Sequence, residues 1–276
     1  MNNENNPGSI KVIGFNLLGW TREFDDREKR SGIIGNMILD QMPDSFGLQE
    51  CNIYWIYLLG PKWLREYAWI GGRNEDLQRN YNPVFYRKDK YRLIDTGTLF
   101  LSDTPDVWCS NFSRRGDQSR FVTYATLQNK QTEAVYTHFN THLSIDREAM
   151  RKQMAVLKQI TDTCKTPFVL TGDFNVDDDW PEYRDLVCKY WRDARREAPE
   201  TTDDATTFFK TMDYCMLSDG IIAETFSVIN DPYVMIQPWK AGDTKGQEYY
   251  LSDHYPVCAT FRLSGNDPLT KGGLQT

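Results

Sequence analysis

A set of polar side chains stands at the ends of apolar segments, where α/β proteins commonly present catalytic groups. The set consists of Asn16, Glu50, Asn140, His142, Asp173, Asn175, Asp213, Asp253 and His254. Taken singly, an acid or amide in such a place is more often a turn or capping residue than a catalytic group. Each residue alone therefore leaves both explanations open.

Asp213 differs from the others because it lies inside an expected strand, in the run FFKTMDYCML. Burying an unpaired charge costs several kcal/mol, so this carboxylate requires a partner, and a histidine is the natural candidate. Because strands alternate with a period of two, His138, Asn140 and His142 point to one side of theirs. For His142, a loop histidine with satisfied hydrogen bonds is an equal alternative to a catalytic one.

Several common enzyme signatures are absent from the 276 residues. No GxxxxGK[ST], GxGxxG, HExxH or GxSxG pattern occurs, so phosphate-loop, dinucleotide-binding, zincin and serine-hydrolase interpretations have no anchor. The net charge, 32 basic minus 39 acidic residues or −7, argues against a protein that coats nucleic acid. It is compatible with an enzyme of phosphate chemistry in which a cation supplies the positive charge.

The segments that must position these residues alternate between strands and helices, which predicts an α/β architecture. Strands are expected at 10–15, 45–49, 83–87, 91–101, 120–127, 133–140, 167–171, 212–217, 221–228 and 256–263. Helices are expected at 23–42, 52–67 and 146–164, with Asn52 as an N-cap. No repeat or linker divides the chain, so we expect one domain over 10–264 with polar tails at 1–9 and 265–276.

The sequence shows no membrane-spanning run, which would require about 18 consecutive apolar residues. The beginning, MNNENNPGS, lacks the pattern of a signal peptide. The six cysteines have no CxxC pair and mostly lie in apolar runs, as reduced core thiols do. We expect a cytoplasmic monomer, with an exported protein whose signal peptide was removed as the alternative.

The chain resembles the endonuclease/exonuclease/phosphatase family, also called the deoxyribonuclease-I-like fold, from Val12 to Leu263. The segments that carry the resemblance are GFNLLGW, PDSFGLQE, the NPVFYR run from Asn82, FNTHLS, PFVLTGDFN, MDYCMLS and LSDHYPV. Bacterial metal-dependent hydrolases are nearest, and the deadenylase and sphingomyelinase branches are more distant. The resemblance implies a four-layer α-β-β-α sandwich, in which two mixed, mostly antiparallel sheets pack face to face between outer helices.

The resemblance also implies Mg²⁺ or Mn²⁺, with Glu50 as the main ligand and Asn16 and Asp253 beside it. Carboxylate and amide oxygens are hard ligands that suit Mg²⁺, which agrees independently. A second cation at 177–179, directly after TGDFN, is a further possibility. A solvated turn that caps the next helix is the favoured reading of those three aspartates.

The remaining roles are likewise implied by the resemblance. Asp173 would position or deprotonate the attacking water, and Asn175 would steady a phosphoryl oxygen. His254 would face the scissile phosphate, with Asp213 holding its tautomer. The phosphate contacts carried over from the family are His142 and Asn140, of the NTH branch, and Arg120.

The predicted function is a Mg²⁺-dependent phosphoesterase that hydrolyses a phosphodiester or phosphomonoester by metal-assisted attack of an activated water. A nuclease acting on DNA or RNA, a sugar, inositol or lipid head-group phosphatase, and a non-catalytic binding module are the alternatives. The acidic balance favours small or short phosphorylated substrates, and no protein partner is implied. Specificity is expected in loops 71–82, 109–120 and 231–250, which hold Arg73, Arg79, Arg114, Arg115 and Trp239.

Overall fold

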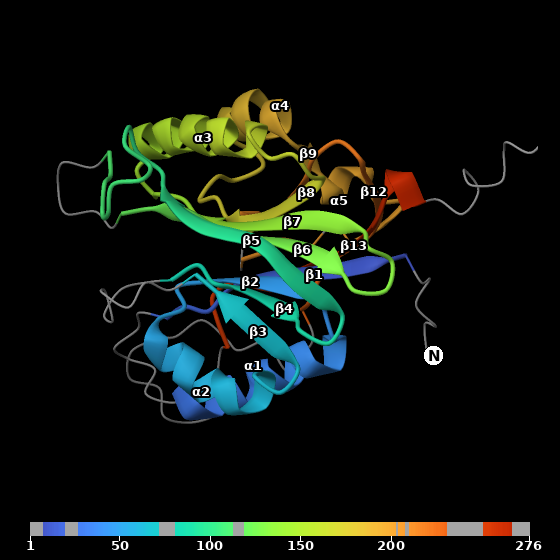
Figure 1. Cartoon of the computed structure of the whole chain (residues 1–276). Coiled ribbons are helices and arrows are strands. Elements are labelled where there is room, and N and C mark those ends of the chain that lie inside the picture. Colours follow the sequence, from blue (N-terminus) through green and yellow to red (C-terminus); the bar gives the residue numbers. More distant parts are fainter. Residues whose placement is uncertain are drawn as a thin grey trace, which may run out of the picture.

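Two mixed β-sheets pack face to face and helices cover their outer sides (Figure 1). The computed structural model describes residues 8–19, 27–71, 81–112, 119–202, 204–207, 210–230 and 251–266. The seven-stranded sheet has the order β10 (Glu200–Thr201), β12 (Ile221–Val228), β13 (Val257–Leu263), β1 (Ile10–Asn16), β2 (Ser45–Gln49), β4 (Val84–Arg87), β3 (Tyr67–Ile70). The six-stranded sheet has the order β5 (Tyr91–Phe100), β6 (Phe121–Asn129), β7 (Val135–His142), β8 (Phe168–Asp173), β11 (Asp213–Leu217), β9 (Arg192–Asp193).

Most neighbouring strands are antiparallel, and the pairs β1–β2, β7–β8 and β10–β12 are parallel. Helices α1 (Arg27–Gln41) and α2 (Ile53–Trp63) lie outside the seven-stranded sheet (Figure 1). Helices α3 (Arg147–Asp162) and α4 (Cys188–Tyr190), with the π-helix η1 (Tyr183–Val187), lie outside the six-stranded sheet. The short helix α5 (Ala194–Glu197) and the 3-10 turn η2 (Ser264–Asn266) complete the described elements. This four-layer sandwich confirms the predicted fold class.

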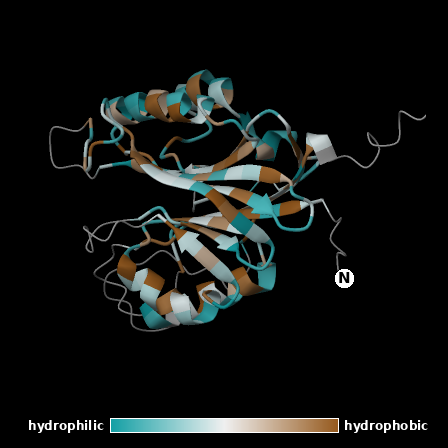
Figure 2. Cartoon of the chain, in the orientation of Figure 1, coloured by the Kyte–Doolittle hydropathy of each residue, from teal (hydrophilic) through white to brown (hydrophobic). Residues whose placement is uncertain are grey.

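Three apolar clusters fill the spaces between the four layers. Strand β1 shows how alternation separates them, since Val12 packs between the sheets while Ile13 and Phe15 face α1 and α2. Figure 2 shows hydrophobic residues running through the strands of both sheets. The same alternation decides which residues at the strand ends face the space between the sheets.

The space between the sheets becomes polar toward the end where β7 and β8 finish. On β8, Val169 belongs to the inter-sheet core, Thr171 follows, and Asp173 ends the strand. His138 on β7 is buried between Ser45 Oγ, 2.7 Å from its Nδ1, and Thr171 Oγ1, 2.8 Å from its Nε2. Burial lowers the pKa of His138 to about 3, so this histidine is a neutral bridge between the two sheets.

Helix starts follow the expected capping chemistry. The Asn52 side chain accepts the backbone N–H groups of Tyr54 and Trp55, and Asp146 caps α3 by accepting from Ala149. The predicted helix at 52–67 is too long, because α2 ends at Trp63 and residues 67–70 form β3, paired with β4. The helix predicted from residue 23 begins at Arg27 in the structure, and residues 20–26 lie outside the described part.

All six cysteines are free thiols, and Cys51, Cys215 and Cys258 are buried. Within the described segments, no helix combines the length and the hydropathy that crossing a bilayer requires.

Candidate functional site

The polar strand-end residues converge at one edge of both sheets. In the six-stranded sheet, Asp173 lies opposite both His142 and Asp213 in register. In the seven-stranded sheet, Asn16 ends β1, and His254 shortly precedes β13, which runs antiparallel to β1. Two parallel neighbouring strands end at the same edge of a sheet, and an antiparallel strand begins at the edge where its neighbour ends. The strand topology therefore brings these side chains to one edge.

Asp173 lies close to polar side chains that come from both sheets. Its Oδ2 accepts a hydrogen bond from Asn16 Nδ2 at 3.0 Å and lies 3.3 Å from His142 Nε2 and 3.8 Å from His254 Nε2. Its Oδ1 accepts the backbone N–H of Asn175 at 2.9 Å. Three side chains from three different strand ends are therefore oriented toward one carboxylate oxygen.

Asp213 and His254 form a buried pair, with Nδ1 of the histidine 2.7 Å from Oδ2 of the aspartate. The partner expected for the charge of Asp213 is thus His254, although Asp213 is the first residue of β11 and not inside the strand. Burial lowers the pKa of His254, but the carboxylates of Asp213 and Asp173 outweigh burial and raise it to about 10. These carboxylates favour the imidazolium form of His254, whose Nε2 lies on the side of Asp173.

Burial raises the pKa of Asp173 to about 6, and the charge of Asp213 adds to the rise while the charge of His254 opposes it. A carboxylate whose pKa lies just below neutral pH is ionised there and still basic enough to accept a proton. The pKa values of Asp173 and His254 are moved apart by their mutual environment, as occurs in acid–base pairs of active sites.

Glu50 reaches the site through an unusual backbone conformation. Gln49 on β2 points between the sheets, where it donates to Asn140, so an extended next residue would point toward the helices. Glu50 instead has φ +54°, and its Oε2 accepts the backbone N–H of Gly19 at 3.0 Å. A Cβ on Gly19 would lie 1.9 Å from the carbonyl oxygen of Glu50, so only glycine allows this approach.

Glu50 lies among other negative charges. Its pKa is raised by burial, then by the carboxylates of Asp173 and Asp253. Asp253 keeps 48% of its side chain exposed, with Oδ1 3.9 Å from His254 Nε2. Carboxylate oxygens of Glu50 and Asp253 and the amide oxygen of Asn16 are hard ligands of the kind that suits a divalent cation, which would offset the repulsion between these charges.

Asp173, Asp213 and His254 also offer three ligand atoms within 4.8 Å of one another. In His254, however, Nδ1 is engaged with Asp213, and the raised pKa favours protonation of both ring nitrogens. A metal needs the lone pair of a neutral imidazole, so these three residues suit proton handling better than coordination.

His142 is a buried neutral histidine beside Asp173. Its pKa is lowered well below the usual value by burial, then by the charges of Arg120 and His254. Nδ1 of His142 has no hydrogen-bond partner among the residues that the structure describes. Arg120 is half-buried directly before β6. Its positive charge is one of the causes that lower the His142 pKa.

Asn140 is enclosed between the two sheets, which leaves no polar atom of its side chain free for the predicted contact with phosphate. Its Nδ2 donates to the carbonyls of Leu48 and Pro83, and its Oδ1 accepts from Gln49 and Thr171. The side chain is fully buried and all four positions of the amide are used. Asn140 joins the two sheets instead of meeting a ligand.

Asn175 has φ +51° and its Nδ2 donates to the Leu143 carbonyl at 2.9 Å, which holds it beside Asp173. Of the acidic run that follows, Asp177 lies 3.2 Å from Lys210 Nζ and Asp178 lies 3.5 Å from Arg195 Nη1. These ion pairs occupy two of the three carboxylates considered for a second cation. The loop residues Arg73, Arg79, Arg114, Arg115 and Trp239 lie outside the described residues.

Two positioning residues were not singled out from the sequence. Thr206 is fully buried, and its Oγ1 accepts the backbone N–H of Asp213 at 3.0 Å while its carbonyl accepts from Tyr255 at 2.7 Å. Ser252 Oγ donates to the Asn16 carbonyl at 2.6 Å and accepts the N–H of His254 at 3.1 Å. Ser252 could have been noticed in LSDH, whereas Thr206 stands among several hydroxyl residues with no distinguishing pattern.

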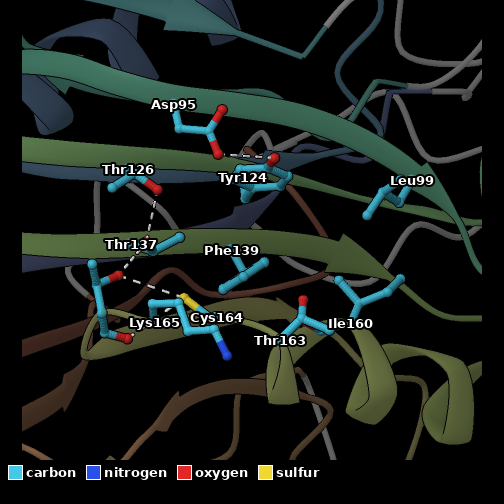
Figure 3. A pocket seen from close by; sticks show the side chains of 11 residues that line it. Asp95, Leu99, Tyr124, Thr126, Thr137, Phe139, Ile160, Thr163, Cys164 and Lys165 are labelled. Atoms are coloured by element: carbon cyan, nitrogen blue, oxygen red, sulfur yellow. Dashed lines mark hydrogen bonds between the residues drawn. The ribbon is translucent and has the colours of Figure 1, made fainter.

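A separate cavity of about 300 Å³ lies against β5, β6, β7 and the end of α3 (Figure 3). Its lining includes Thr137 and Phe139, which alternate with His138 and Asn140 along β7 and so face the opposite side of the sheet. The six-stranded sheet therefore separates this cavity from the site at the strand ends.

Comparisons with known proteins agree with this architecture. A family model described as "Endonuclease/Exonuclease/phosphatase family" matches residues 13–254. An uncharacterized protein of Acanthamoeba polyphaga mimivirus is 28% identical over 189 residues, covering 61% of this chain and 68% of that protein.

Solved structures show the same fold. An endonuclease/exonuclease/phosphatase family protein from Bacteroides thetaiotaomicron has a TM-score of 0.80 at 23% identity, covering 92% of this chain and 98% of that chain. A mannosyl-6-phosphatase from the same bacterium has a TM-score of 0.78 at 22% identity, covering 91% and 99%. The chain belongs to the endonuclease/exonuclease/phosphatase family, whose members are generally hydrolytic phosphoesterases.

Proposed function

We propose that this protein is a divalent-metal-dependent phosphoesterase that hydrolyses a phosphomonoester or phosphodiester by attack of a water molecule. The observation that carries the proposal is the arrangement around Asp173, whose Oδ2 is shared by Asn16 and His142 and approached by a cationic His254. A basic carboxylate beside a preorganised cation is suited to activating water and stabilising phosphate charge.

Glu50, Asn16 and Asp253 are the residues that would hold the metal, Mg²⁺ or Mn²⁺. The raised pKa of Glu50, caused by burial and then by the carboxylates of Asp173 and Asp253, supports this assignment, because a cation would offset the repulsion between these charges. When bound, the metal would polarise a phosphoryl oxygen and neutralise part of its charge.

The chain's own residues supply the proton chemistry. Asp173 orients the attacking water and accepts its proton, and Asn175 holds that carboxylate through its backbone N–H. His254, oriented by Asp213, donates from Nε2 to a phosphoryl oxygen as negative charge develops. The P–O bond to the leaving group breaks as the water adds, and the released alkoxide takes a proton from solvent. Neutral His142 and the guanidinium of Arg120 add donors on the side of the second sheet.

A small phosphorylated molecule is the substrate class that we favour. The net charge of −7 opposes tight binding to long nucleic acid, and a structural neighbour of the chain is a mannosyl-6-phosphatase. Sugar phosphates therefore come first among substrates to test, with nucleic acids as the main competitors.

The test is a panel of sugar phosphates, abasic duplex, single-stranded DNA, RNA and sphingomyelin, assayed with Mg²⁺ and with EDTA. We expect hydrolysis that EDTA abolishes and that Mg²⁺ or Mn²⁺ restores. Asp173→Asn and His254→Ala should remove the activity while the protein remains folded. Asp44→Asn is the matched control, since this buried carboxylate pairs with Lys90 and Tyr91 at the opposite end of β2. Full activity in either site variant, or activity indifferent to chelation, would contradict the proposal.

A further inference from the structure

Arg30, in the first turn of α1, is a buried cation whose side chain crosses between two loops of the site. It is 2% exposed, and its guanidinium lies 4.9 Å from the ring centroid of Trp55. Nε donates to the Leu251 carbonyl at 2.8 Å, Nη2 donates to the carbonyls of Leu17 and Leu251, and Nη1 lies 3.5 Å from the Leu18 carbonyl. Such a fork can bind several carbonyl groups at once, which an ammonium cannot do in the same geometry.

The two segments that Arg30 joins carry residues of the proposed metal centre. Leu17 and Leu18 lead to Gly19, whose N–H donates to Glu50 Oε2 at 3.0 Å. Leu251 leads through Ser252 to Asp253 and His254. The segment after β1 and the segment before β13 are thus held together by Arg30, in addition to the hydrogen bond from Ser252 Oγ to the Asn16 carbonyl.

Arg30 also acts electrostatically on the same centre. Burial and Arg27 lower the pKa of Arg30 to about 10, while Asp253 and Glu50 oppose this, so their charges reach the guanidinium. Placement of ligands by Arg30 favours binding of a cation, whereas its positive charge disfavours it. Removing the charge of Arg30 should weaken cation binding if placement of the ligands dominates and strengthen it if repulsion dominates. A binding measurement therefore separates the two influences.

We propose that Arg30 is a positioning residue for the metal centre, which sets the placement of Asp253 relative to Glu50 by holding their two supporting segments together. This inference rests on the proposed function in its use of the metal. Residues that orient metal ligands contribute roughly 10- to 100-fold to metal affinity in well-studied sites.

The test compares Arg30→Lys, which keeps the charge, with Arg30→Met, which keeps the apolar stem against Trp55. The matched control is Arg192→Met, because Arg192 donates to the carbonyls of Ser218 at 3.0 Å and Ile221 at 3.1 Å near the far end of β11. Binding of Mn²⁺ alone is measured by electron paramagnetic resonance without substrate. Exchange of the Gly19 and His254 amide hydrogens is measured by NMR without metal.

We expect both Arg30 variants to bind Mn²⁺ about 10-fold or more weakly and to exchange the two amides faster, while Arg192→Met matches the wild type. Tighter Mn²⁺ binding in Arg30→Met with no change in Arg30→Lys would overturn the proposal, because charge alone would then explain Arg30. Wild-type affinity and wild-type exchange in Arg30→Lys would also overturn it, and this variant decides if Arg30→Met does not fold. If the wild type binds no Mn²⁺, the proposed function fails, and the amide exchange still decides the role of Arg30.

Discussion

Replacing Asp213 by asparagine isolates the electrostatic part of the proposed mechanism. The substitution keeps the size of the side chain and an oxygen that accepts from Nδ1 of His254, but it removes the negative charge 2.7 Å from the ring. The prediction is that His254 loses much of its preference for the imidazolium form while it remains in place.

The magnitude follows from the environment of the histidine. A rise of the His254 pKa from 6.5 to about 10 corresponds to about 5 kcal/mol in favour of the charged ring. Asp213 contributes most among the carboxylates, and loss of an opposite charge at such a distance lowers a pKa by roughly 1–3 units. We expect Asp213→Asn to lower the His254 pKa by about 2 units from about 10, which removes about half of the imidazolium at pH 8. Hydrolysis should therefore fall roughly 2-fold at pH 8 and progressively more as the pH rises.

The assay is a titration of the imidazole nitrogens by long-range proton–nitrogen NMR in metal-free protein. The chain contains three histidines, so assignment is direct and the other two serve as internal controls. Burial lowers the pKa of His138 to about 3 and holds that of His142 well below its usual value, so both should stay neutral from pH 6 to 10. The matched control is Asp44→Asn. A wild-type His254 that titrates near 6.5, or an Asp213→Asn variant with the wild-type pKa, would refute the reasoning.

Three further predictions follow from local geometry. Gly19→Ala places a Cβ 1.9 Å from the Glu50 carbonyl oxygen, so it should weaken Mn²⁺ binding, measured by calorimetric titration, at least roughly 10-fold. Gly8→Ala, whose Cβ has no atom within 4 Å, should bind Mn²⁺ like the wild type in the same measurement. Thr206→Val leaves the backbone N–H groups of Met212 and Asp213 without their acceptor, so it should lower the free energy of unfolding by about 1–3 kcal/mol and depress kcat. Thr206→Ser should restore both quantities. Unchanged kcat in the valine variant would count against a positioning role. Hydrogen bonds from arginine lower the Glu182 pKa to about 2, below its unfolded value of 4.5, so this stabilisation is present above pH 4.5 and is lost as the pH falls toward 2. The paired arginines are 48% and 55% exposed, so Glu182→Gln should cost only about 1–2 kcal/mol at pH 7 in urea denaturation, with the difference vanishing near pH 2; an equal loss at both pH values would contradict this origin.

Strands that bury apolar residues could be predicted closely from the sequence. The strands at 45–49 and 221–228 have the predicted bounds, because apolar residues and flanking turn residues mark them locally. Strands β3, β9 and β10 were missed, since two to four residues carry no period and their pairing depends on distant partners. Local patterns reveal buried strands, but edge pairing is a tertiary outcome.

The candidate site shows a similar division. Strand ends correctly indicated that Asn16, Asp173 and His254 lie together, because the topology of the family brings these ends to one edge. Asn140 and His142 lie on the same face of β7, and the sequence does not reveal that the first is enclosed by carbonyls while the second lies beside Asp173. The positive φ that directs Glu50 toward the site could not be predicted from the sequence either, because glutamate rarely adopts this conformation.

The two ends of the sandwich differ in what they can tolerate. The turns at 88–90, 130–134 and 218–220 connect strands at the end opposite Asp173, and residues 130–133 are exposed. Lengthening such a turn costs only about 0.6 kcal/mol for each doubling of the loop. The turn at 130–134 is accordingly a natural insertion point for an affinity tag, a fluorophore or a second protein domain, because additions there leave the edge that holds Asp173 unobstructed.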